Sequence, residues 1–189
     1  MGALAILLAF LTGLHMRAEG HWKSYTSPDG GYSVTYPDDW NHYSESRGLY
    51  ILNFPEDRIV PQSLLPKGGA MISFARPRRP MPRSVDKWIR RDAVVQHVVA
   101  SRGMQVAREG ISSQLALRET TAESKFGTLA FEQVNWYFSV NGRLFCAVLL
   151  HHKGDPRRER YRAVLEHVVA SLRCPEGPAD GTRDSQESK

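Results

Sequence analysis

Tyr32-Ser33-Val34-Thr35-Tyr36-Pro37-Asp38-Asp39-Trp40 is the stretch that decides the fold, and it follows the turn-forming residues Ser27-Pro28-Asp29-Gly30-Gly31. Large apolar residues alternate with small polar ones from Tyr32 to Tyr36, which predicts a half-buried strand. Pro37 ends the strand because it has no backbone N–H for the ladder. We expect Trp40, just beyond it, to cap one end of a hydrophobic core.

The N-terminal segment has the pattern of a secretory signal peptide over residues 1–20. Ala3 to Leu14 are almost wholly apolar and too few to span a bilayer, and Ala18-Glu19-Gly20 has the small-x-small spacing of a cleavage site. No Lys or Arg precedes the apolar run, and a buried N-terminal helix is the alternative. We expect a secreted or periplasmic protein with no stable membrane span after signal cleavage.

Length and charge define the folded part of the chain. Residues 175–189 contain no large apolar side chain, which predicts a disordered tail. Residues 21–174 remain, enough for one domain with a real core and too few for two. The whole chain carries +5, and because the tail is acidic by two charges, the domain carries about +7. This excess favours an anionic partner in the cell envelope.

Cys146 and Cys174 are the two cysteines of the chain, and an exported chain with two cysteines can form one disulfide. The strand that ends near His151 spans about 17 Å from Cys146, and the helix that follows Pro156 runs back by about 25 Å. Both thiols should therefore lie near the same end of the domain. The alternative is that Cys146 is a buried, free apolar side chain.

The rest of the pattern predicts strands, a helix, more strands and a closing helix. The expected strands are Tyr32–Tyr36, Tyr50–Phe54, Ala70–Ala75, Met104–Ala107, Gln114–Arg118, Val134–Val140 and Arg143–Leu150, and the expected helices run from Ser84 through Val99 to a stop at Gly103 and from Pro156 to Leu172. Asn141-Gly142 predicts a tight hairpin, because both turn positions need positive φ. The strand that follows it is apolar on both faces and should be central. We therefore expect an α+β fold, a three-layer α/β/α sandwich whose central antiparallel sheet of about six strands has helices on both faces.

Two stretches carry a family resemblance. The first runs from Gly31 through the opening strand to Asn41, and the second runs from Asn141-Gly142-Arg143-Leu144-Phe145-Cys146 through a turn at Asp155 and a basic helix to Ala170-Ser171-Leu172. Both resemble the PsbP-like fold family, to which the Ran-binding Mog-type proteins also belong. The resemblance implies a PsbP-like domain over residues 21–174 that acts as a non-catalytic accessory or binding module. PsbP of photosystem II acts through an extension ahead of this domain, and since only His21 to Pro28 precede the first turn here, no photosynthetic role is implied.

A proline-rich run of arginines is the most unusual surface feature of the sequence. Arg76, Arg78, Arg79 and Arg83 lie among three prolines, and a guanidinium group on a stiff backbone can bind phosphate, sulfate or an acidic protein. A solvated linker is the alternative. Nucleic acid is not expected as a partner, because no aromatic residue is interleaved with the arginines for base stacking.

Histidines offer the other candidate ligands. Cleavage after Gly20 would make His21 the N-terminal residue, whose amine and imidazole could together bind copper if a second histidine were near. His151 and His152 are adjacent on a strand, so their side chains point to opposite faces. We expect them to form a solvated strand end and predict no metal and no cofactor.

No motif for nucleophilic catalysis or phosphate binding occurs in the sequence. We therefore predict that the protein is not an enzyme but an exported accessory or binding protein of the envelope, with an unknown protein or anionic partner. A metal- or small-ligand-binding envelope protein is the alternative.

Overall fold

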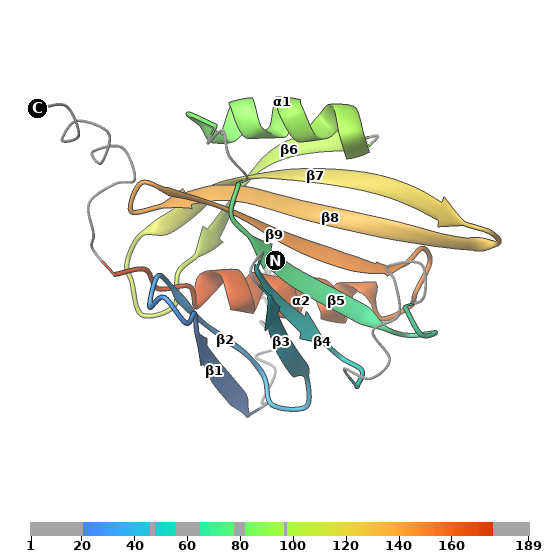
Figure 1. Ribbon diagram of the computed structural model, residues 1–189, viewed down its shortest axis with the longest axis horizontal. Helices are drawn as coiled ribbons and strands as arrows, with labels where there is room; N and C mark the ends of the chain where they lie inside the picture. The colour runs from blue at the N-terminus through green and yellow to red at the C-terminus, as the bar shows by residue number, and fades with distance from the viewer. Residues whose placement is uncertain (1–20, 46–47, 56–64, 78–81, 97, 176–189) are drawn as a thin grey trace, which may run out of the picture.

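The computed structural model describes residues 21–45, 48–55, 65–77, 82–96 and 98–175 (Figure 1). These residues form strands and two helices in the predicted order of strands, helix, strands, helix. The elements are β1 (Trp22–Thr26), β2 (Ser33–Pro37), β3 (Asn41–Glu45), β4 (Gly48–Leu52), β5 (Ala70–Ala75), α1 (Val85–Gln96), β6 (Val98–Ala107), β7 (Gln114–Phe126), β8 (Leu129–Val140), β9 (Arg143–His152) and α2 (Arg158–Ala170). The predicted signal segment and residues 176–189 of the predicted tail lie outside the described residues.

Seven strands form one antiparallel sheet in the order β3-β4-β5-β9-β8-β7-β6. β9 is the middle strand, which confirms the prediction made from its two apolar faces. Phe145 and Ala147 point into the main core, whereas Cys146 and Leu150 pack into smaller clusters on the opposite face. The predicted hairpin joins β8 to β9, with Asn141 at a φ of 50° and the following glycine at 76°.

The main core lies on one face of the sheet, where α2 and the separate two-stranded sheet β1–β2 close it (Figure 1). Val34 and Tyr36 of β2 are 1% and 2% exposed, as the alternating pattern predicts. Trp40 is 3% exposed, and its ring packs edge-on against Tyr161 of α2 at a centroid distance of 6.3 Å. A backbone bridge between Ser33 and Arg173 ties β2 to the end of the domain. The predicted role of Trp40 as a core cap is confirmed.

The prediction of a three-layer α/β/α sandwich is wrong. The described chain is mostly strand, its main sheet has seven strands, and the helices α1 and α2 have only 12 and 13 residues. α1 lies mainly against β7 and β8, where Trp88 packs edge-on against Tyr137, and Trp88 also packs with Cys146 of β9. A helical layer is not needed there, because antiparallel strands tolerate a solvated face and most residues of β6 are exposed.

The first helix also ends earlier than the sequence predicts. α1 stops at Gln96, and the chain continues as β6, paired with a β7 that extends to Phe126. Val99, expected on the buried helical face, is 62% exposed, and Gly103, expected as the helix stop, lies opposite Arg118 within the sheet. Long-range strand pairing overrides the helical spacing of the local sequence. None of the helices in the described ranges is long and apolar enough to cross a membrane.

The β1–β2 sheet docks on α2 through His167. The His167 ring stacks on Trp22 with the ring centroids 3.4 Å apart, and its Nε2 lies 3.0 Å from the Thr35 hydroxyl. Burial lowers the pKa of His167 below its ordinary value of 6.5, against a smaller opposing effect of Glu109. The folded protein therefore favours the neutral ring.

We expect the free energy of unfolding of the protein to fall in acid because His167 is buried in its neutral form. Between the lowered folded pKa of His167 and 6.5, the unfolded chain binds a proton that the folded chain does not, so the free energy of unfolding falls as the pH drops through this window. Urea unfolding at about pH 7.5 and about pH 5 measures the effect. The His167→Gln variant should show a smaller loss than the wild type, and equal losses would contradict the assignment.

Candidate functional site

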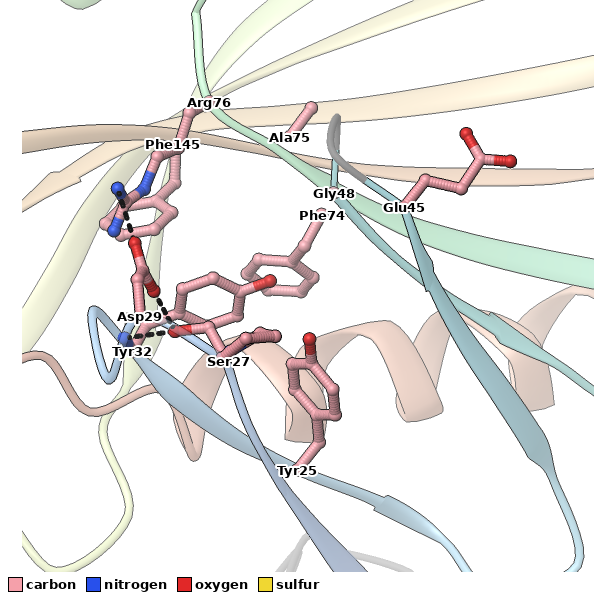
Figure 2. Close-up of a pocket in the computed structure, with 11 residues that line it drawn as sticks. Tyr25, Ser27, Asp29, Tyr32, Glu45, Gly48, Phe74, Ala75, Arg76 and Phe145 are labelled. Atoms are coloured by element: carbon pink, nitrogen blue, oxygen red, sulfur yellow. Dashed lines mark hydrogen bonds and ion pairs between the residues drawn. The ribbon is translucent and has the colours of Figure 1, made fainter.

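A pocket of about 340 Å³ lies at the end of the sheet where β5 ends and β9 begins (Figure 2). The turn after β1, the end of β3, the start of β4, the end of β5 and the start of β9 enclose it. The residues that line it are Tyr25, Ser27, Pro28, Asp29, Tyr32, Glu45, Gly48, Phe74, Ala75, Arg76 and Phe145. We call it the Arg76 pocket.

A tight turn places Asp29 at the rim of the Arg76 pocket. The Ser27 hydroxyl donates to Asp29 Oδ1 at 2.6 Å, and the Gly31 N–H donates to the same oxygen at 2.9 Å. The Ser27 hydroxyl also accepts the Tyr32 N–H at 3.0 Å, which fixes the start of β2. The Ser27 hydroxyl, then the Gly31 N–H and the charge of Arg76, hold the pKa of Asp29 below its ordinary value of 3.8. Asp29 is therefore an anion at neutral pH.

Arg76 extends from the end of β5 across two aromatic rings. Its guanidinium carbon lies 5.9 Å from the ring centre of Tyr32 and 5.8 Å from that of Phe145, within the range of cation–π attraction. Its Nη1 lies 3.5 Å from Asp29 Oδ2 (Figure 2). A side chain at Gly31 would collide with this guanidinium, so the glycine is needed for the arrangement. The Arg76 side chain is still 39% exposed, which leaves donors open to a ligand.

Two tyrosines place their hydroxyl groups inside the Arg76 pocket. Figure 2 shows the hydroxyls of Tyr25 and Tyr32 directed toward the same space beside Phe74. Burial, with a smaller effect of Tyr25, raises the pKa of Tyr32, so this phenol stays protonated and can donate a hydrogen bond. Within the described lining no His, Cys or Lys stands ready as a general base, and the Ser27 hydroxyl is engaged in the turn. The described lining thus offers aromatic surface, phenolic hydroxyls, one guanidinium and the carboxylates of Asp29 and Glu45.

The structure describes two arginines of the predicted run, and only one of them lines the Arg76 pocket. Arg76 lines the pocket, whereas Arg83 is an exposed residue ahead of α1 and does not. Arg78 and Arg79 lie outside the described residues. The partners of Arg76 come from the turn after β1 and from β9, whereas the sequence predicted Asp29 to be a turn residue. Only the folded sheet brings these distant segments together.

The expected solvated strand end at His151 and His152 is not what the structure shows. His151 is 2% exposed, with Nδ1 2.9 Å from the carbonyl oxygen of His152 and Nε2 3.9 Å from Glu132 Oε1. His152 Nε2 lies 2.8 Å from the carbonyl oxygen of Leu65. Leu65 therefore lies against this strand end, a long-range contact that no local sequence pattern indicates. Among the described side chains, His21 included, no three His, Cys, Asp or Glu residues gather as metal ligands.

The two cysteines occupy different faces of the sheet. Cys146 packs with Trp88 and Tyr137 under α1, whereas Cys174 packs against the main core on the other side. Both are free thiols in the structure. Burial raises the pKa of both thiols, so neither is an activated thiolate. The disulfide therefore stays a prediction, and this geometry does not support it.

A thiol count decides the state of the cysteines. The structure predicts two reactive thiols in the denatured, unreduced protein, and in the folded protein Cys174 should react faster than Cys146 because only Cys174 is partly exposed. The Cys174→Ser variant assigns the fast signal. A denatured protein with no reactive thiol would contradict the structure and support the disulfide.

A second polar cluster lies around Glu119 of β7, and the sequence did not predict it. The buried Glu119 carboxylate accepts hydrogen bonds from Arg102 Nε at 2.8 Å and Trp136 Nε1 at 2.7 Å, and it pairs with the Arg162 guanidinium. Glu119 lies on the same buried face of the strand as Leu115 and Leu117. The alternation could have indicated this, but the predicted strand ended one residue earlier, at Arg118. This cluster lies in the sheet, away from the Arg76 pocket, and holds α2 to β7 and β8.

Comparisons with known proteins find a similar fold among solved structures. No protein-family model matches the chain, and no curated protein sequence matches it. A solved structure from Bacteroides thetaiotaomicron VPI-5482 is similar, with a TM-score of 0.50 and 17% identity over 80% of this chain. The match covers 48% of that protein, so this chain spans about half of its length.

Two further similar structures have names. Cyanobacterial PsbP from Synechocystis sp. PCC 6803 aligns with a TM-score of 0.48 and 11% identity, over 87% of this chain and 98% of its own. The Ran-binding protein Mog1p from Saccharomyces cerevisiae aligns with a TM-score of 0.45 and 6% identity, over 82% and 96%. The predicted resemblance to PsbP-like and Mog-type proteins is thus confirmed by the similar structures. At these identities the likeness concerns the fold alone.

Proposed function

We propose that this protein is a non-catalytic binding protein of the cell envelope that recognises an acidic protein partner through the Arg76 pocket. The observation that carries this proposal is Arg76 itself, a guanidinium stacked over two rings at the rim of an aromatic pocket. A partner would place an apolar side chain between the rings and a neighbouring carboxylate on the guanidinium.

The energetics of the rim favour an incoming carboxylate. The Arg76–Asp29 pair is exposed, 39% and 62% for its two side chains, and such pairs contribute about 0–1 kcal/mol. A ligand carboxylate can therefore add to or replace Asp29 at small cost. The two rings hold the guanidinium plane in place, which lowers the entropy lost on binding.

The envelope location rests on the sequence. Residues 1–20 have the secretory signal pattern, and the domain that follows carries about +7. A positive domain attracts acidic partners and speeds their encounter through long-range electrostatics.

The Arg76→Ala variant tests the proposal. Cross-linking capture from the envelope fraction of the source cells, followed by titration of the captured partner, should show binding at least about tenfold weaker for this variant than for the wild type. Arg83→Ala removes an exposed arginine outside the pocket and should bind like the wild type. Equal binding by the wild type and Arg76→Ala would overturn the proposal.

The size of the pocket favours one further candidate, a small organic anion. A volume of about 340 Å³ falls within the range of small-molecule sites, and the walls are aromatic. Calorimetric titration with aromatic carboxylates distinguishes a small-ligand site from a protein-binding site. Saturable binding that Arg76→Ala abolishes would favour the small ligand over the protein partner.

A further inference from the structure

The hairpin that joins β7 to β8 projects beyond the rest of the sheet (Figure 1). The pairing of β6 with β7 stops at Ala122, and the pairing of β9 with β8 stops at Phe131. Just beyond these points the Lys153 N–H still donates to the Ala130 carbonyl oxygen at 2.8 Å, and further out the described residues of the two strands pair with each other, to Phe126 opposite Leu129. We call residues 123–130 the hairpin tip.

Apolar side chains occupy the end of the hairpin tip. Phe126 is 57% exposed and Leu129 is 37% exposed, and as directly opposed residues they lie on the same face of the ribbon. The left-handed Gly127, with a φ of 58°, closes the turn between them. Four large apolar side chains of the described residues are exposed, and Phe126 is the aromatic one.

The hairpin tip contains one acidic and one basic side chain, Glu123 and Lys125, and of these the basic one is left unpaired in the described structure. Glu123 is paired with Lys153, with Oε2 and Nζ 2.6 Å apart, so neither contributes a free charge. Lys125, next to Phe126, is exposed and has no ion-pair partner among the described residues. The end of the tip therefore combines two apolar side chains with one cation.

From this arrangement we propose that the hairpin tip docks the protein on an anionic lipid surface, with Phe126 and Leu129 inserted at the interface and Lys125 against the headgroups. A protein partner or a second copy fits less well. A stable protein interface buries about 800 Å² on each side, whereas the two side chains of a narrow, convex tip offer much less. A bilayer needs no complementary groove, and apolar side chains flanked by lysine suit its interface.

This docking is independent of the proposed function. The Arg76 pocket lies at the start of β9 and the hairpin tip beyond its end, about 30 Å apart for a strand of this length. Arg76→Ala should therefore leave lipid binding unchanged, so that failure of one proposal leaves the other standing.

Vesicle sedimentation tests the docking with the full chain. Vesicles of phosphatidylethanolamine and phosphatidylglycerol should bind the wild type, and the double variant Phe126→Ser with Leu129→Ser should bind at least about tenfold more weakly. Ile111→Ser is the matched control, because Ile111 is also 37% exposed but lies in the turn at the other end of β7. Lys125→Ala should lose about threefold to fivefold on these vesicles and nothing on neutral phosphatidylcholine vesicles.

A depth measurement provides the second readout. In the Phe126→Trp variant, the fluorescence added over the wild type should be quenched by bromine-labelled lipids. No binding by the wild type, or unchanged binding by the double variant, would overturn the proposal. Self-association that sedimentation velocity detects in the wild type and not in the double variant would also overturn it, and would indicate a second copy as the occupant.

Discussion

Replacing Glu119 with alanine is expected to lower the free energy of unfolding by about 3 kcal/mol. Glu119 is 4% exposed, and its carboxylate accepts from the indole N–H of Trp136, which is 0% exposed. The same carboxylate neutralises Arg162, whose guanidinium lies 5.7 Å from the Trp136 ring centre. The variant leaves a buried donor without an acceptor and a half-buried cation without its counter-ion.

Urea unfolding measures this loss, and an exposed ion pair of the same sheet is the control. Glu123→Ala removes the partner of Lys153, but these side chains are 41% and 49% exposed, so we expect a loss below about 1 kcal/mol. Glu119→Gln keeps an acceptor for Trp136 and should lose less than Glu119→Ala. Similar losses for Glu119→Ala and Glu123→Ala would show that the buried cluster does not stabilise the fold.

Replacing Trp40 with alanine should cost about 4 kcal/mol of the free energy of unfolding. Trp40 is 3% exposed and belongs to the main core, where it packs against Tyr161 of α2. Tyr161 in turn donates a hydrogen bond to the carbonyl oxygen of Gly68 at 2.8 Å. Truncation would therefore leave a cavity where β2, α2 and the loop before β5 meet.

Thermal and urea unfolding of Trp40→Ala measure the cost, with Phe126→Ala as the control. Phe126 is 57% exposed at the hairpin tip, and its truncation should change stability by no more than about 0.5 kcal/mol. A loss below about 1 kcal/mol for Trp40→Ala would contradict its place in the core.

Elements defined by neighbouring residues were predictable. The alternation from Tyr32 to Tyr36 and the turn Asn141-Gly142 depend on side-chain spacing and backbone preference, and both appear in the structure as predicted. β9 was predictable as the central strand because it is apolar on both faces. In each case the local pattern and the tertiary contacts favour the same conformation.

The prediction failed where the local sequence pattern and the tertiary contacts favour different conformations. Residues after Gln96 have helical spacing, yet they pair with β7 as the edge strand β6. The layers were wrong for a related reason, because the sequence contains apolar strands but does not say which faces stay in water. His151 was expected in solvent, because no local pattern indicates that Tyr161 of α2 and Glu132 of β8 lie beside it.

By itself, the sequence determined the order of the elements, the central strand, the tight hairpin and the tryptophan of the core, because these follow from the spacing of apolar side chains and the backbone preferences of Gly, Pro and Asn. Only the tertiary structure decided the number of strands in the sheet, the burial of Glu119 and the placing of Arg76 over Tyr32 and Phe145. Those features depend on pairing between segments far apart in the chain, and its free energy comes from packing and hydrogen bonds that no local pattern contains.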